Sequence, residues 1–165
     1  MHPADPQWQQ LGERLRLELD AVLSQWLVVP VEHVGSTAVP GLAAKPVLDL
    51  QAVVADLGCA PAMAEALARN GWHLVPVELD ARPWRRFLVQ VNDGQRVAHL
   101  HLLEPDGRRW HEQLAFRDAL RQNPGLVKQY AALKAQLADE HADDREAYTA
   151  AKTGFIRAVL RGRPS

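Results

Sequence analysis

Residues 31–51 read VEHVGSTAVPGLAAKPVLDLQ and carry the most informative pattern of the chain. A predicted strand leads into Gly35-Ser36-Thr37, where glycine lets backbone amides approach a bound group closely. Two hydroxyls and exposed N–H groups at the start of a turn or helix suit a phosphate, although the same residues could form a plain turn with a helix N-cap. Lys45 adds a cation nearby, and Lys45-Pro46 could equally be an exposed lead into the next strand.

Asp49 lies in a predicted strand over residues 47–54. Leu48 and Leu50 point to the face opposite from Asp49 and Gln51, because side chains alternate along a strand. A carboxylate in so apolar a strand is costly unless it is exposed in a cleft or paired. It could be held by backbone amides or an arginine, but the nearby glycine–serine turn favours a ligand or a hard cation such as Mg²⁺.

Two histidines share one face of a later predicted strand. His99 and His101 are two residues apart, so together they could bind one metal or contact one anion. Taken alone, they fit a pair of satisfied histidines on a wet sheet surface better. A composite site follows only if this strand lies beside that of Asp49.

An arginine cluster flanks Trp84 just before the strand predicted over residues 84–91. Arg85 and Arg86 could clamp a phosphate, or an arginine could simply stack on Trp84 at the surface. The sequence gives no reason to prefer either role.

The hydrophobic pattern predicts an α+β fold with a mixed or antiparallel sheet flanked by helices, followed by a helical C-terminal portion. A single unit is expected, with residues 1–106 as the α+β core and 107–165 as helices packed on it. Asn123-Pro124 marks the start of a helix. The expected helices are 7–27, 60–70, 108–122, one from Asn123-Pro124, and a last one containing Tyr148, Lys152, Phe155 and Val159; the expected strands are 28–34 (bent at Pro30), 47–54, 72–77, 84–91 and 96–103, the last two joined by a turn at 92–95, with a loop or short helical turn at 35–46.

Composition narrows the class of protein without identifying its chemistry. The chain has 165 residues, 47% of them hydrophobic, and a formal net charge of −1, which excludes a uniformly basic nucleic-acid coat. Its one cysteine excludes a disulfide framework and a multi-cysteine zinc site. No apolar run is long enough to span a membrane and the start lacks signal-peptide features, so we expect a cytoplasmic protein.

Charge is unevenly divided along the chain. Residues 1–106 hold 8 basic and 13 acidic side chains, whereas residues 107–165 hold 11 basic and 7 acidic. Solvated helix faces explain the basic third most simply, and a wall facing an anion is the sharper alternative. Nucleic acid is not expected, because Trp110, Phe116 and Tyr130 fit helix-core spacing better than a stacking platform.

Several separated motifs resemble the GrpB family, which belongs to the nucleotidyltransferase-like fold group. The pattern EHxGSTxVPGLxxKPxxD over residues 32–49 resembles its signature, and the match extends over roughly residues 28–160. The family is also similar to a C-terminal domain of some bacterial dephospho-coenzyme A kinases. The later motifs are His99-Leu100-His101, Trp110, Phe116-Arg117-Asp118-x-Leu120-Arg121-x-x-Pro124, Tyr130-x-x-Leu133-Lys134-x-x-Leu137-Ala138 and Tyr148-x-x-x-Lys152-x-x-Phe155-Ile156.

The resemblance implies roles for particular residues. In active nucleotidyltransferases a Gly-Ser turn binds the triphosphate, and three strand carboxylates hold two Mg²⁺ ions. Gly35-Ser36 matches the turn and Asp49 the first acid, but Gln51 stands at the second acid and histidines at the later strand. Two of the three carboxylates that hold the Mg²⁺ ions are therefore missing here. A softer cation such as Zn²⁺ or Mn²⁺ would suit the histidines better than Mg²⁺.

These observations predict a specific site and ligand. We expect a nucleotide or other phosphate-containing small molecule, a divalent metal, and transfer of a nucleotidyl group as one outcome; a non-catalytic ligand-binding module, or one that stabilises a protein partner, is the alternative. The expected residues are Asp49 for catalysis, Gly35, Ser36, Thr37, Lys45, Arg85 and Arg86 for phosphate, and Asp49, His99 and His101 for the metal.

Overall fold

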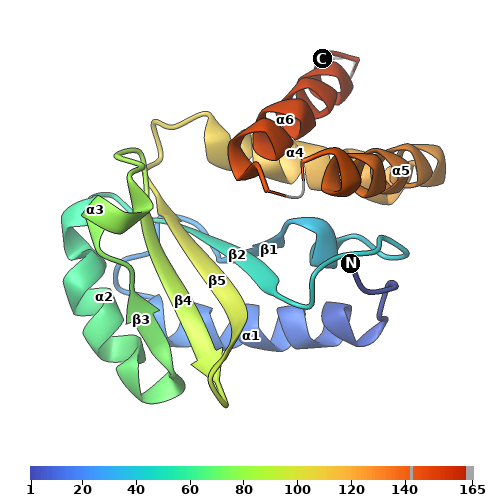
Figure 1. Ribbon diagram of the computed structural model, residues 1–165. Coiled ribbons are helices and arrows are strands. Elements are labelled where there is room, and N and C mark those ends of the chain that lie inside the picture. Colours follow the sequence, from blue (N-terminus) through green and yellow to red (C-terminus); the bar gives the residue numbers. More distant parts are fainter. Residues whose placement is uncertain (142, 163–165) are drawn as a thin grey trace.

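The computed structural model describes residues 1–141 and 143–162 and contains one five-stranded sheet (Figure 1). The strand order is β1-β2-β5-β4-β3. The strands are β1 (Glu32–Val34), β2 (Leu48–Val53), β3 (Trp72–Leu74), β4 (Arg86–Asn92) and β5 (Gln95–Leu103). The helices are α1 (Gln7–Leu23), α2 (Ala60–Leu67), α3 (Val77–Asp80), α4 (Arg109–Gln122), α5 (Pro124–Glu140) and α6 (Arg145–Arg161), with short 3₁₀ turns η1 (Ser36–Ala38), η2 (Leu57–Cys59) and η3 (Ala68–Asn70).

The sheet is mixed, and its one parallel pairing forms the centre. β2 runs parallel to β5, with Asp49 opposite His99 and Gln51 opposite His101. The other neighbouring pairs are antiparallel. Because side chains alternate along each strand, this register places all four polar residues on one face of the sheet.

The opposite face of the sheet is apolar and carries the main core. Leu50 and Leu100, which are fully buried, pack with apolar side chains of α1 and α2. On α1, Leu15, Leu19 and Leu23 recur at helical spacing and supply its buried stripe.

Helices α4, α5 and α6 form a group on the side of the sheet away from α1 (Figure 1). Val39 and Leu42, from the segment after η1, pack with Leu120 of α4 and Tyr130 of α5 in a second apolar cluster. Among the described residues, no helix is both long enough and apolar enough to cross a membrane.

The α+β fold class and the mixed sheet are confirmed, and three local expectations were wrong. The strand predicted over 28–34 begins only at Glu32. The first helix ends at Leu23 and not near residue 27, because Leu27 forms a β-bridge with Val54 and the Val28 N–H donates to Val53 O at 2.9 Å. The strand predicted over 72–77 stops at Leu74, and the short helix α3 follows it.

Candidate functional site

The sheet register brings Asp49, His99 and His101 together. Asp49 Oδ1 lies 3.1 Å from His99 Nδ1 and 3.5 Å from His101 Nε2. One donor atom from each residue lies within 4.8 Å of the others, and all three side chains are partly exposed. The three residues, called here the DHH cluster, are therefore positioned to share one ligand.

Asp49 is the anionic member of this cluster. Burial alone would raise the pKa of its carboxyl, but hydrogen bonds from His101 and His99 outweigh burial and hold that pKa well below its ordinary value. Burial also lowers the pKa of His101, despite the favourable charge of Asp49. The cluster thus presents a carboxylate at neutral pH.

Arg85 fixes the proton position on His101. Its Nη1 lies 2.7 Å from His101 Nδ1, and a guanidinium has only donors, so Nδ1 accepts and the proton of a neutral His101 lies on Nε2, facing Asp49. Asp80 holds the Arg85 guanidinium with two hydrogen bonds, and the same guanidinium lies 4.3 Å above the Phe87 ring.

This donor set suits one borderline cation better than a pair of Mg²⁺ ions. One carboxylate and two imidazoles are typical of Zn²⁺ or Mn²⁺ sites, whereas Mg²⁺ prefers oxygen ligands. Asp49 fits such a cation as it stands, whereas His99 can bind one through Nδ1 only after this nitrogen loses the proton that it donates to Asp49 Oδ1. His101 fits only if Arg85 releases Nδ1, because its Nε2 otherwise carries a proton and no lone pair.

The glycine–serine turn lies directly against the cluster. Gly35 has φ of +72°, and a Cβ built on it would lie 2.7 Å from Asp49 Oδ2. Only glycine combines that backbone conformation with that close approach. The turn η1 follows at once, so Ser36 begins it beside the carboxylate.

Lys134 of α5 is a site residue that sequence reasoning missed. Its Nζ donates to Ser36 Oγ at 2.9 Å and to Ala43 O at 2.7 Å, and the side chain is only 4% exposed. Burial, and then the charge of Lys152 on α6, lower the pKa of Lys134 to about 8. Its position one helical turn from Tyr130 on a buried stripe was the available signal.

Three predicted phosphate ligands do not join this arrangement. Thr37 is buried, with its Oγ1 2.9 Å from His33 Nε2. Lys45 is exposed on the loop before β2. Arg86 pairs with Leu102 on the opposite sheet face and donates to the carbonyl of Arg85 at 2.8 Å.

Gln51, at the position of the second acid, has a structural contact in this fold. It is 1% exposed, and its Nε2 donates to Trp110 O at 3.2 Å, which ties β2 to the start of α4. Its Oε1 is buried and has no hydrogen-bond partner within the described chain. The geometry around position 51 is therefore that of a neutral amide.

A cavity of about 450 Å³ lies past the end of β5. Leu103, which lines it, is two residues beyond His101 and on the same face of the sheet. Trp84 and Trp110 supply aromatic surface there, and the Arg109 guanidinium lies 4.0 Å from the centre of the Trp84 ring.

Comparison with known proteins places this geometry in a family. The family model described as GrpB protein matches residues 1–162. A glutamate-rich protein GrpB of Alkalihalophilus pseudofirmus is 30% identical, over 93% of this chain and 88% of the relative. A dephospho-CoA kinase of Mycolicibacterium paratuberculosis is 31% identical over 96% of this chain, which spans only 44% of that longer protein.

Solved structures agree with the family match and extend the fold comparison. The crystal structure of GrpB from Enterococcus faecalis has a TM-score of 0.78 and 31% identity, covering 96% of this chain and 93% of that one. Cid1, solved in complex with a UTP analogue, has a TM-score of 0.61 at 14% identity, covering 90% of this chain and 48% of Cid1. The second likeness shows a nucleotidyltransferase-like fold. From the family match and the first structural likeness together, we conclude that this chain belongs to the GrpB family.

Proposed function

We propose that this GrpB protein binds a nucleotide or another phosphate-containing small molecule where Gly35, Ser36 and Lys134 meet the DHH cluster. The observation that carries the proposal is the buried ammonium of Lys134. Within the described chain it has hydrogen-bonding oxygens but no carboxylate at ion-pair distance. A buried cation without a counter-ion is costly, and an anionic ligand would remove that cost.

Phosphate suits this position better than other anions. Ser36 offers a hydroxyl and the start of η1, Lys134 offers a charge, and glycine at position 35 leaves the backbone accessible. A single Mn²⁺ or Zn²⁺ on Asp49 and His99 would neutralise phosphate oxygens and polarise the phosphorus when bound. The cavity bounded by Trp84 and Trp110 gives room for a flat base farther along the same face.

Binding is a better-supported function than two-cation nucleotidyl transfer. Transfer by that route needs a second carboxylate to compensate the charge of the second cation. Position 51 holds a buried amide bonded to a helix carbonyl, and the later strand supplies histidines. We therefore assign ligand binding, with Asp49 as a cation ligand, as the primary activity.

A second candidate is a module that stabilises a protein partner in the cytoplasm. The dephospho-CoA kinase relative favours it, because there the matched region is less than half of a longer chain. In that role the helical portion would contact the partner and the DHH cluster would be dispensable.

Thermal shift measurements with ATP, CTP, GTP and UTP, each with Mg²⁺, Mn²⁺ or Zn²⁺, test the proposal. We expect at least one triphosphate to raise the melting temperature, most strongly with Mn²⁺ or Zn²⁺. Lys134→Met and Asp49→Asn should reduce or abolish the shift. Lys128→Met is the matched control, since Lys128 is an exposed lysine on the same helix. Absence of any shift in the wild type, or an unchanged shift in Lys134→Met, would favour the partner module.

A further inference from the structure

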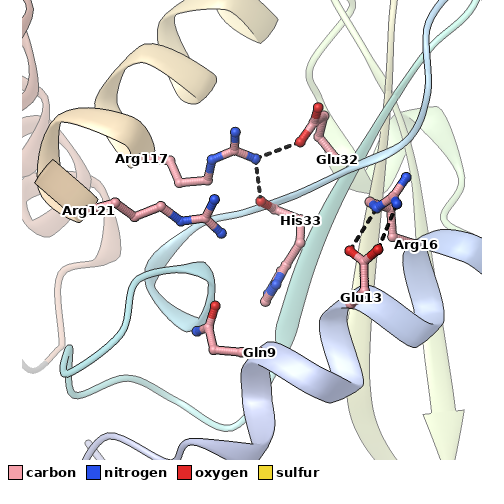
Figure 2. A pocket seen from close by; sticks show the side chains of 7 residues that line it. All are labelled: Gln9, Glu13, Arg16, Glu32, His33, Arg117 and Arg121. Carbon is pink, nitrogen blue, oxygen red and sulfur yellow. Dashed lines mark hydrogen bonds and ion pairs between the residues drawn. The ribbon is translucent and has the colours of Figure 1, made fainter.

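A second polar cavity lies between α1, β1 and α4 (Figure 2). Its volume of about 160 Å³ has room for a small ion and not for a nucleotide. Gln9 and the Glu13–Arg16 pair line it from α1, and His33 lines it from β1. It is separate from the DHH cluster, because His33 points to the sheet face opposite from Asp49.

Two arginines on α4 converge on this cavity. Arg117 and Arg121 are one helical turn apart, and Figure 2 shows their guanidiniums turned toward the same space above Gln9. Arg117 is buried and donates to Glu32 Oε2 at 2.7 Å, to His33 O at 2.9 Å and, through Nε, to Asp118 Oδ1 at 2.8 Å. These bonds occupy Nε and Nη1, so Nη2 is the nitrogen that Arg117 can offer to a ligand. Arg121 donates through Nε to Ala38 O at 2.9 Å, which leaves its terminal nitrogens available.

The acids of the cavity are already paired with other arginines. Glu13 forms an ion pair with Arg16 at 2.7 Å, and Glu32 forms one with Arg117. Within the described residues, Arg121 has no carboxylate at ion-pair distance. Partial burial, and then the like charge of Arg117, lower the pKa of Arg121. Arg117 is paired with Asp118 as well as with Glu32, and Arg16 is paired with Asp20 as well as with Glu13. Among the described residues that line the cavity, Arg121 is therefore the arginine whose charge has no paired carboxylate.

His33 adds no charge to this balance. Burial, and then the charge of Arg121, lower the pKa of His33 to about 4, so the imidazole is neutral at pH 7. Its ring packs directly on Gly12, where a Cβ would collide with the imidazole. The cationic side chains that line the cavity are thus its arginines, and His33 is not one of them.

From these contacts we propose that the cavity is a binding site for a small oxyanion, held by the guanidiniums of Arg117 and Arg121. Guanidiniums bind phosphate and carboxylate oxygens through paired, charge-assisted hydrogen bonds. The site goes beyond the proposed nucleotide site and does not depend on it. The turn η1 separates the two, since Arg121 contacts Ala38 O and Lys134 contacts Ser36 Oγ.

Titration with inorganic phosphate at low ionic strength tests this site. Binding is measured by calorimetry and by the ¹⁵N chemical shifts of the arginine Nε–H groups. In the wild type we expect saturable binding that moves the Nε–H signals of Arg117 and Arg121. Arg121→Gln should weaken it at least tenfold; this side chain is exposed, so the variant should fold. Arg69→Gln, which removes an exposed arginine on η3, should leave it unchanged.

A second experiment distinguishes phosphate bound in this cavity from phosphate bound at the proposed nucleotide site. In Lys134→Met, inorganic phosphate should still move the Arg117 signal with the wild-type midpoint, whether or not nucleotide binding exists. Loss of that response in Lys134→Met, or equal phosphate affinity in Arg121→Gln and the wild type, would overturn the proposal. A shift in all arginine signals without saturation would also overturn it, because it indicates ionic screening only.

Discussion

At the scale of single residues, the site depends on how closely the glycine–serine turn approaches Asp49. Gly35 is the contact point, because its missing side chain lets the backbone lie against the carboxylate. The sequence placed Gly35, Ser36 and Asp49 in one hypothesis from their spacing alone. It could not show that a lysine nearly one hundred positions later would complete the arrangement, since that contact depends on how α5 packs.

Gly35→Ala and Gly41→Ala form a matched pair that tests this approach. Both glycines have positive φ, +72° and +77°, but a Cβ at Gly41 would meet nothing within 4 Å. Gly41→Ala should therefore lower the free energy of unfolding by about 1 kcal/mol, because only the backbone is strained. Gly35→Ala should lower it by about 2–3 kcal/mol, because Asp49 must also move. Urea unfolding measures both. Equal losses would show that the contact with Asp49 is unimportant.

Arg85 is predicted to restrain metal binding at the DHH cluster. Because it occupies His101 Nδ1, the double variant Asp80→Asn/Arg85→Gln should free His101 Nε2 for a cation without leaving a buried acid unpaired. We expect the double variant to bind Zn²⁺ about tenfold more tightly than the wild type. Groups that are hydrogen-bonded to a metal ligand typically change metal affinity by about tenfold or more. Competition with a chromophoric chelator measures it. Weaker or unchanged binding would mean that Arg85 helps to position His101 as a ligand.

At the scale of elements, Gln51 joins the sheet to the helical portion. Gln51→Glu would place a carboxylate against the carbonyl of Trp110 in a buried position and should destabilise the fold by about 3 kcal/mol or more. Gln51→Leu removes both the hydrogen bond and the unpartnered Oε1, so its effect should stay within about 1 kcal/mol. Chemical denaturation compares the two. A stable Gln51→Glu protein would reopen the two-cation mechanism.

Elements with local signals were predictable from the sequence. Asn123 caps α5 by accepting from the N–H groups of Gly125 and Leu126, as Asn-Pro indicated. Asp93 and Gly94 both have positive φ in the predicted hairpin turn. The end of α1 was not predictable, because the bridge between Leu27 and Val54 depends on a strand that forms much later in the chain. The same limitation concealed the burial of Lys134.

At the scale of the whole molecule, the second apolar cluster connects the core to the helices. Leu42 is fully buried there with Leu120 and Tyr130. Leu42→Ala should lower the free energy of unfolding by about 2–5 kcal/mol, the usual range for a buried leucine.

If residues 1–106 and 107–162 unfold as one unit, the unfolding transitions seen by tryptophan fluorescence and by far-ultraviolet circular dichroism should coincide. Two separated transitions would show that the helical portion unfolds alone.

Phosphate binding by Lys134 and Ser36 is tested most directly by the number of protons taken up on binding. A buried lysine with a pKa of about 8 should regain its proton when an anion arrives, because the anion favours the charged form. At pH 8.5, which is above that pKa, most of the Lys134 amine is neutral in the free protein, so the wild type should take up protons on binding tripolyphosphate, up to one per site. Calorimetry in two buffers of different ionisation enthalpy measures this uptake. We predict that Lys128→Met matches the wild type, while Lys134→Met binds at least tenfold more weakly and takes up no proton. Binding of equal strength in Lys134→Met, or wild-type binding without proton uptake, would contradict the account.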